Sequence, residues 1–197
     1  MTVTDPKTDL HSYLQEARDA LLWKLDGLSE YDIRRPVVRT GTNLLGLVKH
    51  LTAIELAYFG DTFNRPYPGA LSWDDSDPNS DMFARADESR ELITGQYRQA
   101  WAHADATIGE LPLDAIGHVP WWGVPRNEVT LHQILVRMTS ETSRHAGHAD
   151  ILRELIAGAA GMASQHLSLP PDDEAWWSTY RNRVERAACE AADPPGA

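Results

Sequence analysis

Hydrophobic residues recur every three or four positions in four long segments of the chain, which is the period of an amphipathic α-helix. Prolines and glycines interrupt the chain between these segments, and Thr42 or Asn43 offers a side chain that can cap the second one. The pattern therefore predicts an all-α protein built as a four-helix bundle. The four predicted helices cover about residues 9–28, 44–62, 87–111 and 131–155.

Two irregular stretches and a C-terminal extension complete the predicted architecture. Residues 64–81 contain three prolines and a run of acidic residues without a hydrophobic period, so we expect an exposed loop there. A second irregular stretch follows the third helix and contains two adjacent tryptophans. After Gly158, a linker leads to an additional C-terminal helix over about residues 170–190. We expect residues 1–197 to form a single domain with its bundle core at about 9–158.

The fourth predicted helix carries polar residues within an otherwise apolar stripe. Glu141, His145 and His148 all fall at the three-four spacing of that stripe. A carboxylate at such a position is costly to bury unless it is paired or binds a metal ion. Glu141 and His145 lie one helical turn apart on the same face, where both can hold one ion. His50 occupies the apolar stripe of the second helix and offers a third ligand when the helices face each other.

The same residues also have a purely structural interpretation. Each histidine could be a hydrogen-bonded core residue, and Glu141 could pair with Arg144 or Arg153. The combination of two histidines and one carboxylate favours a metal, because acidic residues are rarely fully buried. For His148 two interpretations stay open. It could orient a ligand or act as a general base, or it could be a packing histidine.

Two segments of the chain resemble the DinB-like superfamily. Gly46–Tyr58, GLVKHLTAIELAY, is similar to its second helix, and Glu141–Leu155, ETSRHAGHADILREL, is similar to its last bundle helix. Most members bind metal through three histidines, whereas a glutamate four positions before the histidine resembles the branch of mycothiol-dependent maleylpyruvate isomerases and mycothiol S-transferases. The resemblance covers about the first 160 residues and implies an up-down-down-up bundle. Its implied metal ligands are His50, Glu141 and His145.

The resemblance implies metal-dependent chemistry on a small thiol. The expected activity is that of a thiol-dependent S-transferase or isomerase, in which mycothiol or a similar thiol attacks an electrophilic small molecule. Zinc is the expected divalent metal, with nickel, iron and manganese as alternatives, because three protein ligands leave an open position where a thiol can lose its proton. The isomerases carry a further C-terminal domain where this chain predicts one short helix, so maleylpyruvate itself is not the expected substrate.

Two other functions fit the same ligand set. Two histidines and one carboxylate also describe non-haem iron(II) oxygenases. A closed site completed by His148 or His132 would instead favour a non-enzymatic metal-binding protein of the stress response. The ligands alone do not separate these functions from thiol transfer.

Further residues are candidates for binding the substrate or the thiol. Three arginines could bind a carboxylate: Arg126, Arg144 and Arg153. Trp121 and Trp122 could close the core or form the wall of an apolar pocket over the ion. Glu55 and Asp150 each lie five residues beyond a proposed ligand, and we expect them to be solvated or to support that ligand.

Composition narrows the class of partner. The 29 acidic and 18 basic residues give a formal net charge of −11, which repels nucleic acid and anionic membranes. Cys189 is the only cysteine, so no internal disulfide can form, and a reducing compartment such as the cytoplasm is expected. No apolar run reaches the roughly 18 residues that span a bilayer. A homodimer is left open.

Overall fold

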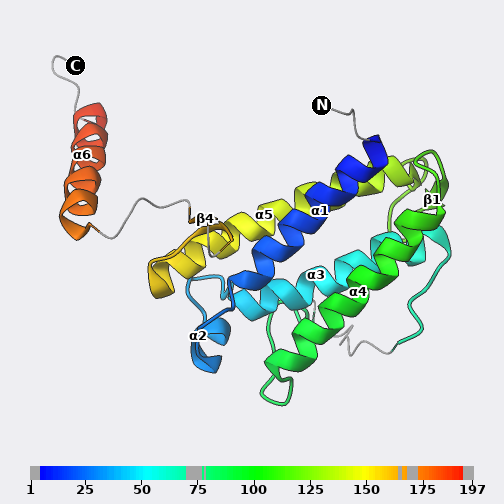
Figure 1. Cartoon of the computed structure of the whole chain (residues 1–197), viewed down its shortest axis with the longest axis horizontal. Coiled ribbons are helices and arrows are strands. Elements are labelled where there is room, and N and C mark those ends of the chain that lie inside the picture. The colour runs from blue at the N-terminus through cyan, green and yellow to red at the C-terminus, as the bar shows by residue number, and fades with distance from the viewer. Residues whose placement is uncertain (1–4, 70–76, 78, 164–165, 168–172, 193–197) are drawn as a thin grey trace. The chain divides into compact units, whose positions relative to one another are not determined.

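Four long helices form a bundle in the computed structural model of the chain (Figure 1). The structure describes residues 5–69, 77, 79–163, 166–167 and 173–192. The bundle helices are α1 (Pro6–Trp23), α3 (Leu44–Phe59), α4 (Arg90–Glu110) and α5 (Leu131–Ala157). In Figure 1, α1 and α5 run in one direction and α3 and α4 in the opposite one. The all-α, up-down-down-up bundle is therefore confirmed.

Local capping signals set the ends of these helices. Asp5 and Ser89 accept hydrogen bonds from backbone amides three residues later, so α1 and α4 begin directly after them. Thr130 and Gln133 form a capping box at the start of α5. Gly158 adopts a left-handed φ of 67° and ends α5 at the predicted place. The helix boundaries therefore follow directly from residue types.

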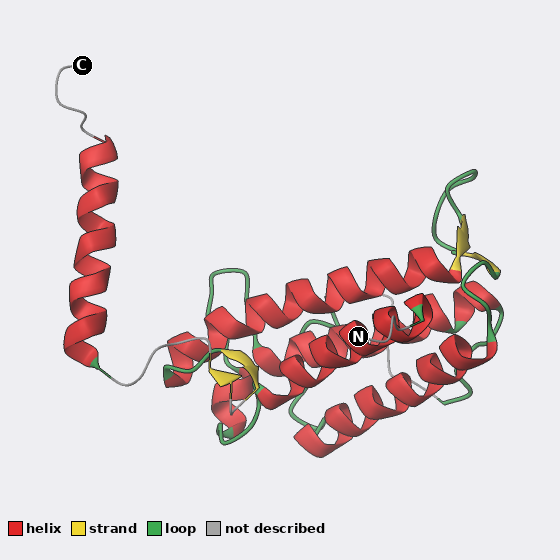
Figure 2. Cartoon of the chain, turned by 45° about the horizontal axis from the view of Figure 1, so that its top comes forward, coloured by secondary structure: helices red, strands yellow, loops and turns green. Residues whose placement is uncertain are grey.

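The hydrophobic pattern missed the smaller elements. They are α2 (Glu30–Arg34), the 3-10 helix η1 (Asp61–Phe63), and the strands β1 (Ile116–His118), β2 (Glu128–Thr130), β3 (Gly161–Ala163) and β4 (His166–Leu167). The strands pair as two antiparallel hairpins at the ends of the bundle (Figure 2). Elements of two to five residues are too short to show a hydrophobic period. The predicted first helix also extended too far, since α1 ends at Trp23.

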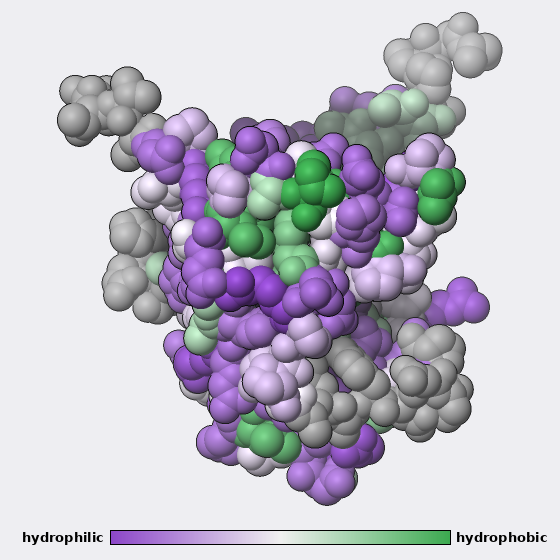
Figure 3. Space-filling model, turned by 90° about the vertical axis from the view of Figure 1, so that its right-hand side faces the viewer, coloured by the Kyte–Doolittle hydropathy of each residue, from purple (hydrophilic) through white to green (hydrophobic). Residues whose placement is uncertain are grey.

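The bundle core contains residues from all four long helices. Leu21, Leu47, Tyr97 and Leu152 are almost completely buried in one cluster. A second cluster gathers the other ends of α3, α4 and α5. The end of the bundle that carries β1 shows a patch of apolar side chains within a mainly polar surface (Figure 3). Among the described residues, no helix is long and apolar enough to cross a membrane.

Of the two alternatives expected for Glu55, the solvated one is wrong. Its side chain is fully buried and receives two hydrogen bonds from Arg18 on α1, at 3.0 Å and 2.6 Å. Arg18 also donates to Asp105 on α4 at 2.8 Å. Burial raises the pKa of Glu55, and the Arg18 charge opposes that rise. The pair therefore ties α1, α3 and α4 together within the core.

The C-terminal helix is α6 (Glu174–Ala192). It confirms the additional helix expected after the bundle. Residues 168–197 form a compact unit separate from residues 1–167, and none of the α6 side chains is buried. That the whole chain acts as one domain stays a prediction. Most of the acidic run within 70–78 lies outside the described residues.

Candidate metal centre

His50, Glu141 and His145 come together between α3 and α5. One potential ligand atom from each residue lies within 4.8 Å of the others. His145 Nε2 is 3.1 Å from Glu141 Oε1, and the ring centroids of the two histidines are 5.0 Å apart. Metal–ligand bonds of about 2.0–2.2 Å place neighbouring ligand atoms about 3.0–3.5 Å apart. Small side-chain adjustments would therefore bring all three onto one divalent ion.

A segment before α4 is fastened to α3 beside His50. Gly46 lies so close to the backbone of Met82 that an added Cβ would collide with the Met82 carbonyl oxygen. Lys49 forms a buried ion pair with Glu88 at 2.9 Å. Burying one partner without the other would leave an uncompensated charge, so the pair holds this segment firmly in place. Gly46 and Lys49 both lie about one helical turn or less from His50, so these contacts hold the segment beside His50.

The fastened segment brings Asp81 to His50. Asp81 Oδ2 lies 2.5 Å from His50 Nδ1. A carboxylate at this position accepts the Nδ1 hydrogen and leaves Nε2 to bind a metal. Sequence reasoning missed Asp81 because the two residues are 31 positions apart and the intervening loop has no hydrophobic period. The only sequence signal was an acidic residue at the end of that loop.

His148 lies beside His145 on the exposed side of α5. The Nδ1 atoms of the two histidines are 3.4 Å apart, while Nε2 of His145 faces Glu141. Burial lowers the pKa of His145 below its usual 6.5, and charge on His50 adds to that decrease, whereas Glu141 opposes it. The lowered pKa favours the neutral imidazole, which is the form that binds a metal.

The expectation that Glu141 is buried at the centre of the core is wrong. Its side chain keeps 28% of its exposure, because the central core stripe of α5 runs through Leu135 and Ala149 instead. Glu141 contacts His145, and none of the ion pairs among the described residues joins it to Arg144 or Arg153. The ligand set therefore lies at the border of the core and can be reached from solvent.

The predicted arginines and His132 lie in different places. Arg153 donates to three carbonyl groups at the C-terminal end of α1, at 3.2, 2.6 and 3.0 Å, which favours a capping role. Arg144 is exposed on α5, and Arg126 is exposed before β2. His132 lies nine residues before Glu141, about 13 Å along the helix, and does not join the ligand group found among the described residues.

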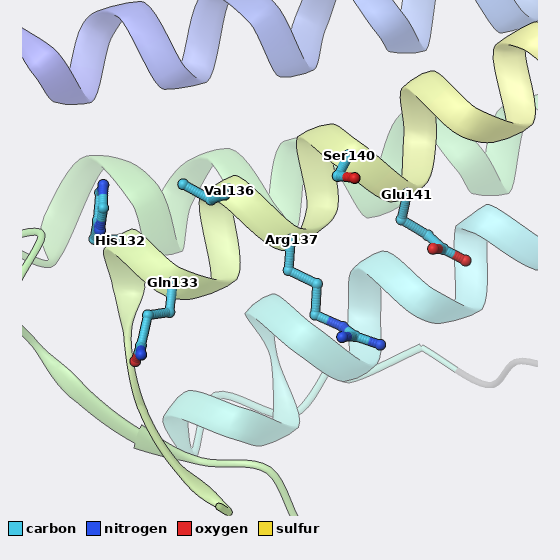
Figure 4. Close-up of a pocket in the computed structure, with 6 residues that line it drawn as sticks. All are labelled: His132, Gln133, Val136, Arg137, Ser140 and Glu141. Atoms are coloured by element: carbon cyan, nitrogen blue, oxygen red, sulfur yellow. The ribbon is translucent and has the colours of Figure 1, made fainter.

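One pocket reaches the ligand set, and Arg137 lines both this pocket and a second one. The first, of about 410 Å³, reaches Glu141 along α5. Figure 4 shows the Arg137 guanidinium and the Glu141 carboxylate on the same side of α5, pointing toward α3. The second pocket, of about 460 Å³, is lined by Trp121, Trp122, Gly123, Arg126 and Arg137. The two tryptophans thus form pocket walls, and sequence reasoning missed the arginine between the pockets.

Comparisons with known proteins show the family and the fold of the chain. A family model described as mycothiol-S-transferase matches residues 9–158. The crystal structure of a conserved protein of a locus from Enterococcus faecalis is similar, with a TM-score of 0.55 and 14% sequence identity over 79% of this chain and 99% of that chain. At this identity the likeness shows a common fold alone. No curated protein sequence matches the chain.

Proposed function

The chain belongs to the mycothiol S-transferase family, and we propose that it uses one divalent metal ion to transfer the sulfur of mycothiol, or of a similar thiol, to an electrophilic small molecule. The observation that carries this proposal is the ligand group His50, Glu141 and His145 beside an open pocket. Reversible addition of the thiol to a double bond at the same site would give isomerisation.

The donor set fits a catalytic metal. Two imidazoles and one carboxylate suit zinc best, with nickel, iron and manganese as alternatives, and three protein ligands leave a position for a thiol. When bound, zinc supplies positive charge that lowers the pKa of a thiol and favours the thiolate near neutral pH. Asp81 holds the His50 ring in one orientation through the 2.5 Å contact.

The chain's own residues bind and orient the reactants. Partly exposed Glu141 faces the pocket where the thiol and the electrophile would meet. His148 is exposed beside His145, where it can accept the thiol proton and release it to water. The sulfur then forms a bond to the electrophilic carbon. In substitution a leaving group departs with the bonding electron pair, and in addition to a double bond a proton returns to the neighbouring carbon.

An anaerobic conjugation assay tests this function. Protein purified without a histidine tag and loaded with one equivalent of zinc should consume mycothiol and 1-chloro-2,4-dinitrobenzene in equal amounts. His145→Ala should lose at least about 100-fold in rate because the ion loses a ligand. His118→Ala is the matched control. The His118 side chain is 63% exposed, and it pairs with Glu128, which is not one of the proposed ligands.

Three results would contradict the proposal. Equal rates for metal-free and zinc-loaded protein would exclude a role for the metal. Turnover that requires iron(II) and oxygen would support an oxygenase instead. A metal bound by four protein ligands and insensitive to thiols would support a non-enzymatic metal-binding protein.

A further inference from the structure

Arg137 lines the pocket that reaches Glu141 and packs against two aromatic rings. Its Cζ atom lies 5.0 Å from the centroid of the Tyr58 ring and 4.9 Å from that of Trp122. Among the described residues it forms no hydrogen bond or ion pair, whereas many other arginines of the chain are paired. Two aromatic rings therefore hold the group while its N–H donors stay free.

One of the pockets that Arg137 lines carries two arginines, in a protein that is acidic overall. Arg126 is the second arginine that lines it, and no lining residue is acidic. The formal net charge of the chain is −11, so two arginines without carboxylates in one pocket go against the general charge balance. Trp121 and Trp122 add aromatic faces to the walls of this pocket. These features together favour an anionic ligand that has an apolar body.

We propose that the electrophilic substrate carries a carboxylate and that Arg137 binds it, with Arg126 as a second donor. This inference rests on the proposed function. Mycothiol has no carboxylate, so with mycothiol as the thiol the anion belongs to the other substrate. A guanidinium fork matches a carboxylate with two parallel hydrogen bonds.

The spacing along α5 limits the size of the substrate. Arg137 precedes Glu141 by four residues, which is about 6 Å along the helix axis. We therefore infer that the substrate is a small acid that can reach from Arg137 to the ligand set.

A pair of aromatic electrophiles with matched shape tests this recognition. 4-Chloro-3-nitrobenzoate carries a carboxylate para to the carbon that bears chloride, and 4-chloro-3-nitrobenzamide is its neutral counterpart. In both, the thiol sulfur bonds to the ring carbon, chloride leaves with the bonding electron pair, and the thiol proton passes to water. After division by the uncatalysed rate, kcat/KM should favour the benzoate by about 10- to 100-fold.

Substitutions of Arg137 test whether this residue causes the preference for the benzoate over the benzamide. Arg137→Gln should lose most of the preference by slowing the benzoate reaction alone, and Arg137→Lys should keep part of it through charge. Arg98→Gln removes an exposed arginine of α4 that does not line the pocket, so it should behave as wild type. Equal preference in Arg137→Gln and wild type would overturn the proposal.

A binding measurement separates this inference from the proposed function. 3-Nitrobenzoate has no leaving group, and calorimetry should show that Arg137→Gln binds it about 10- to 100-fold more weakly than wild type. If no variant conjugates either electrophile while this difference in binding persists, the proposed transfer fails and the anion site stands. Binding that requires zinc but is unaffected by Arg137→Gln would show that the carboxylate binds the metal, which overturns the inference.

Discussion

Removal of the Asp81 carboxylate tests how the chain prepares His50 for a metal. In the structure Asp81 Oδ2 lies 2.5 Å from His50 Nδ1, so the carboxylate fixes the tautomer and the orientation of the ring. Loss of such an outer carboxylate lowers metal affinity by about 10- to 100-fold, or about 1.4 to 2.7 kcal/mol. Asp81→Ala should show this full loss. Asp81→Asn should lose less, because the amide oxygen can still accept the Nδ1 hydrogen.

Zinc affinity can be measured by competition with a chromophoric chelator at neutral pH. Asp87→Ala is the matched control, because Asp87 belongs to the same segment, is 74% exposed and contacts Arg85 at 3.2 Å. Circular dichroism should show unchanged helix content in both variants. If Asp81→Ala binds zinc with wild-type affinity, the segment before α4 does not orient His50 and the reasoning is wrong.

Three further predictions concern the ligand and the buried ion pair. Glu141→Gln keeps the size of the side chain but removes its charge, so zinc affinity should fall more than about 100-fold with the fold intact; elemental analysis that finds full metal would show another ligand in its place. Glu88→Gln leaves Lys49 buried without its counter-ion and should lower the free energy of unfolding in urea by about 3 kcal/mol; a loss within error would refute the proposed anchor. Burial alone would raise the pKa of Glu88, but hydrogen bonds from Lys49 and from the Arg85 backbone keep that pKa below its usual 4.5. The folded pKa is depressed, so this stabilisation is complete above pH 4.5 and is lost as the pH falls through the folded value; the difference in unfolding free energy between wild type and Glu88→Gln should therefore shrink in acid.

Helices and candidate ligands could be predicted because both depend on local spacing. The three-four period of α5 placed Glu141 and His145 on one face, and the structure brings them within reach of His50. That these residues bind a metal is still a proposal. Asp81 and Arg137 could not be found in the same way, since each depends on contacts between segments distant in sequence.

The misplaced expectations have the same cause. The helical period around Glu55 on α3 gave no sign of its partner, because that partner is Arg18 on α1, 37 residues earlier. Glu141 fell within an apolar period, but α5 packs along a neighbouring stripe and leaves the carboxylate partly exposed. A hydrophobic period shows which face of a helix a residue lies on. How deeply that face is buried depends on how the helix packs against its neighbours.

The most direct test of the account is the spectrum of the cobalt(II)-substituted protein in the presence of a small thiol. Cys189→Ser serves as the background, because this removes the only thiol of the chain. Added thiol should produce a sulfur-to-cobalt charge-transfer band at neutral pH, below the usual thiol pKa of about 8.5, and the band should be absent in His50→Ala. A cobalt spectrum that no thiol perturbs would contradict a metal with an open position for thiol chemistry.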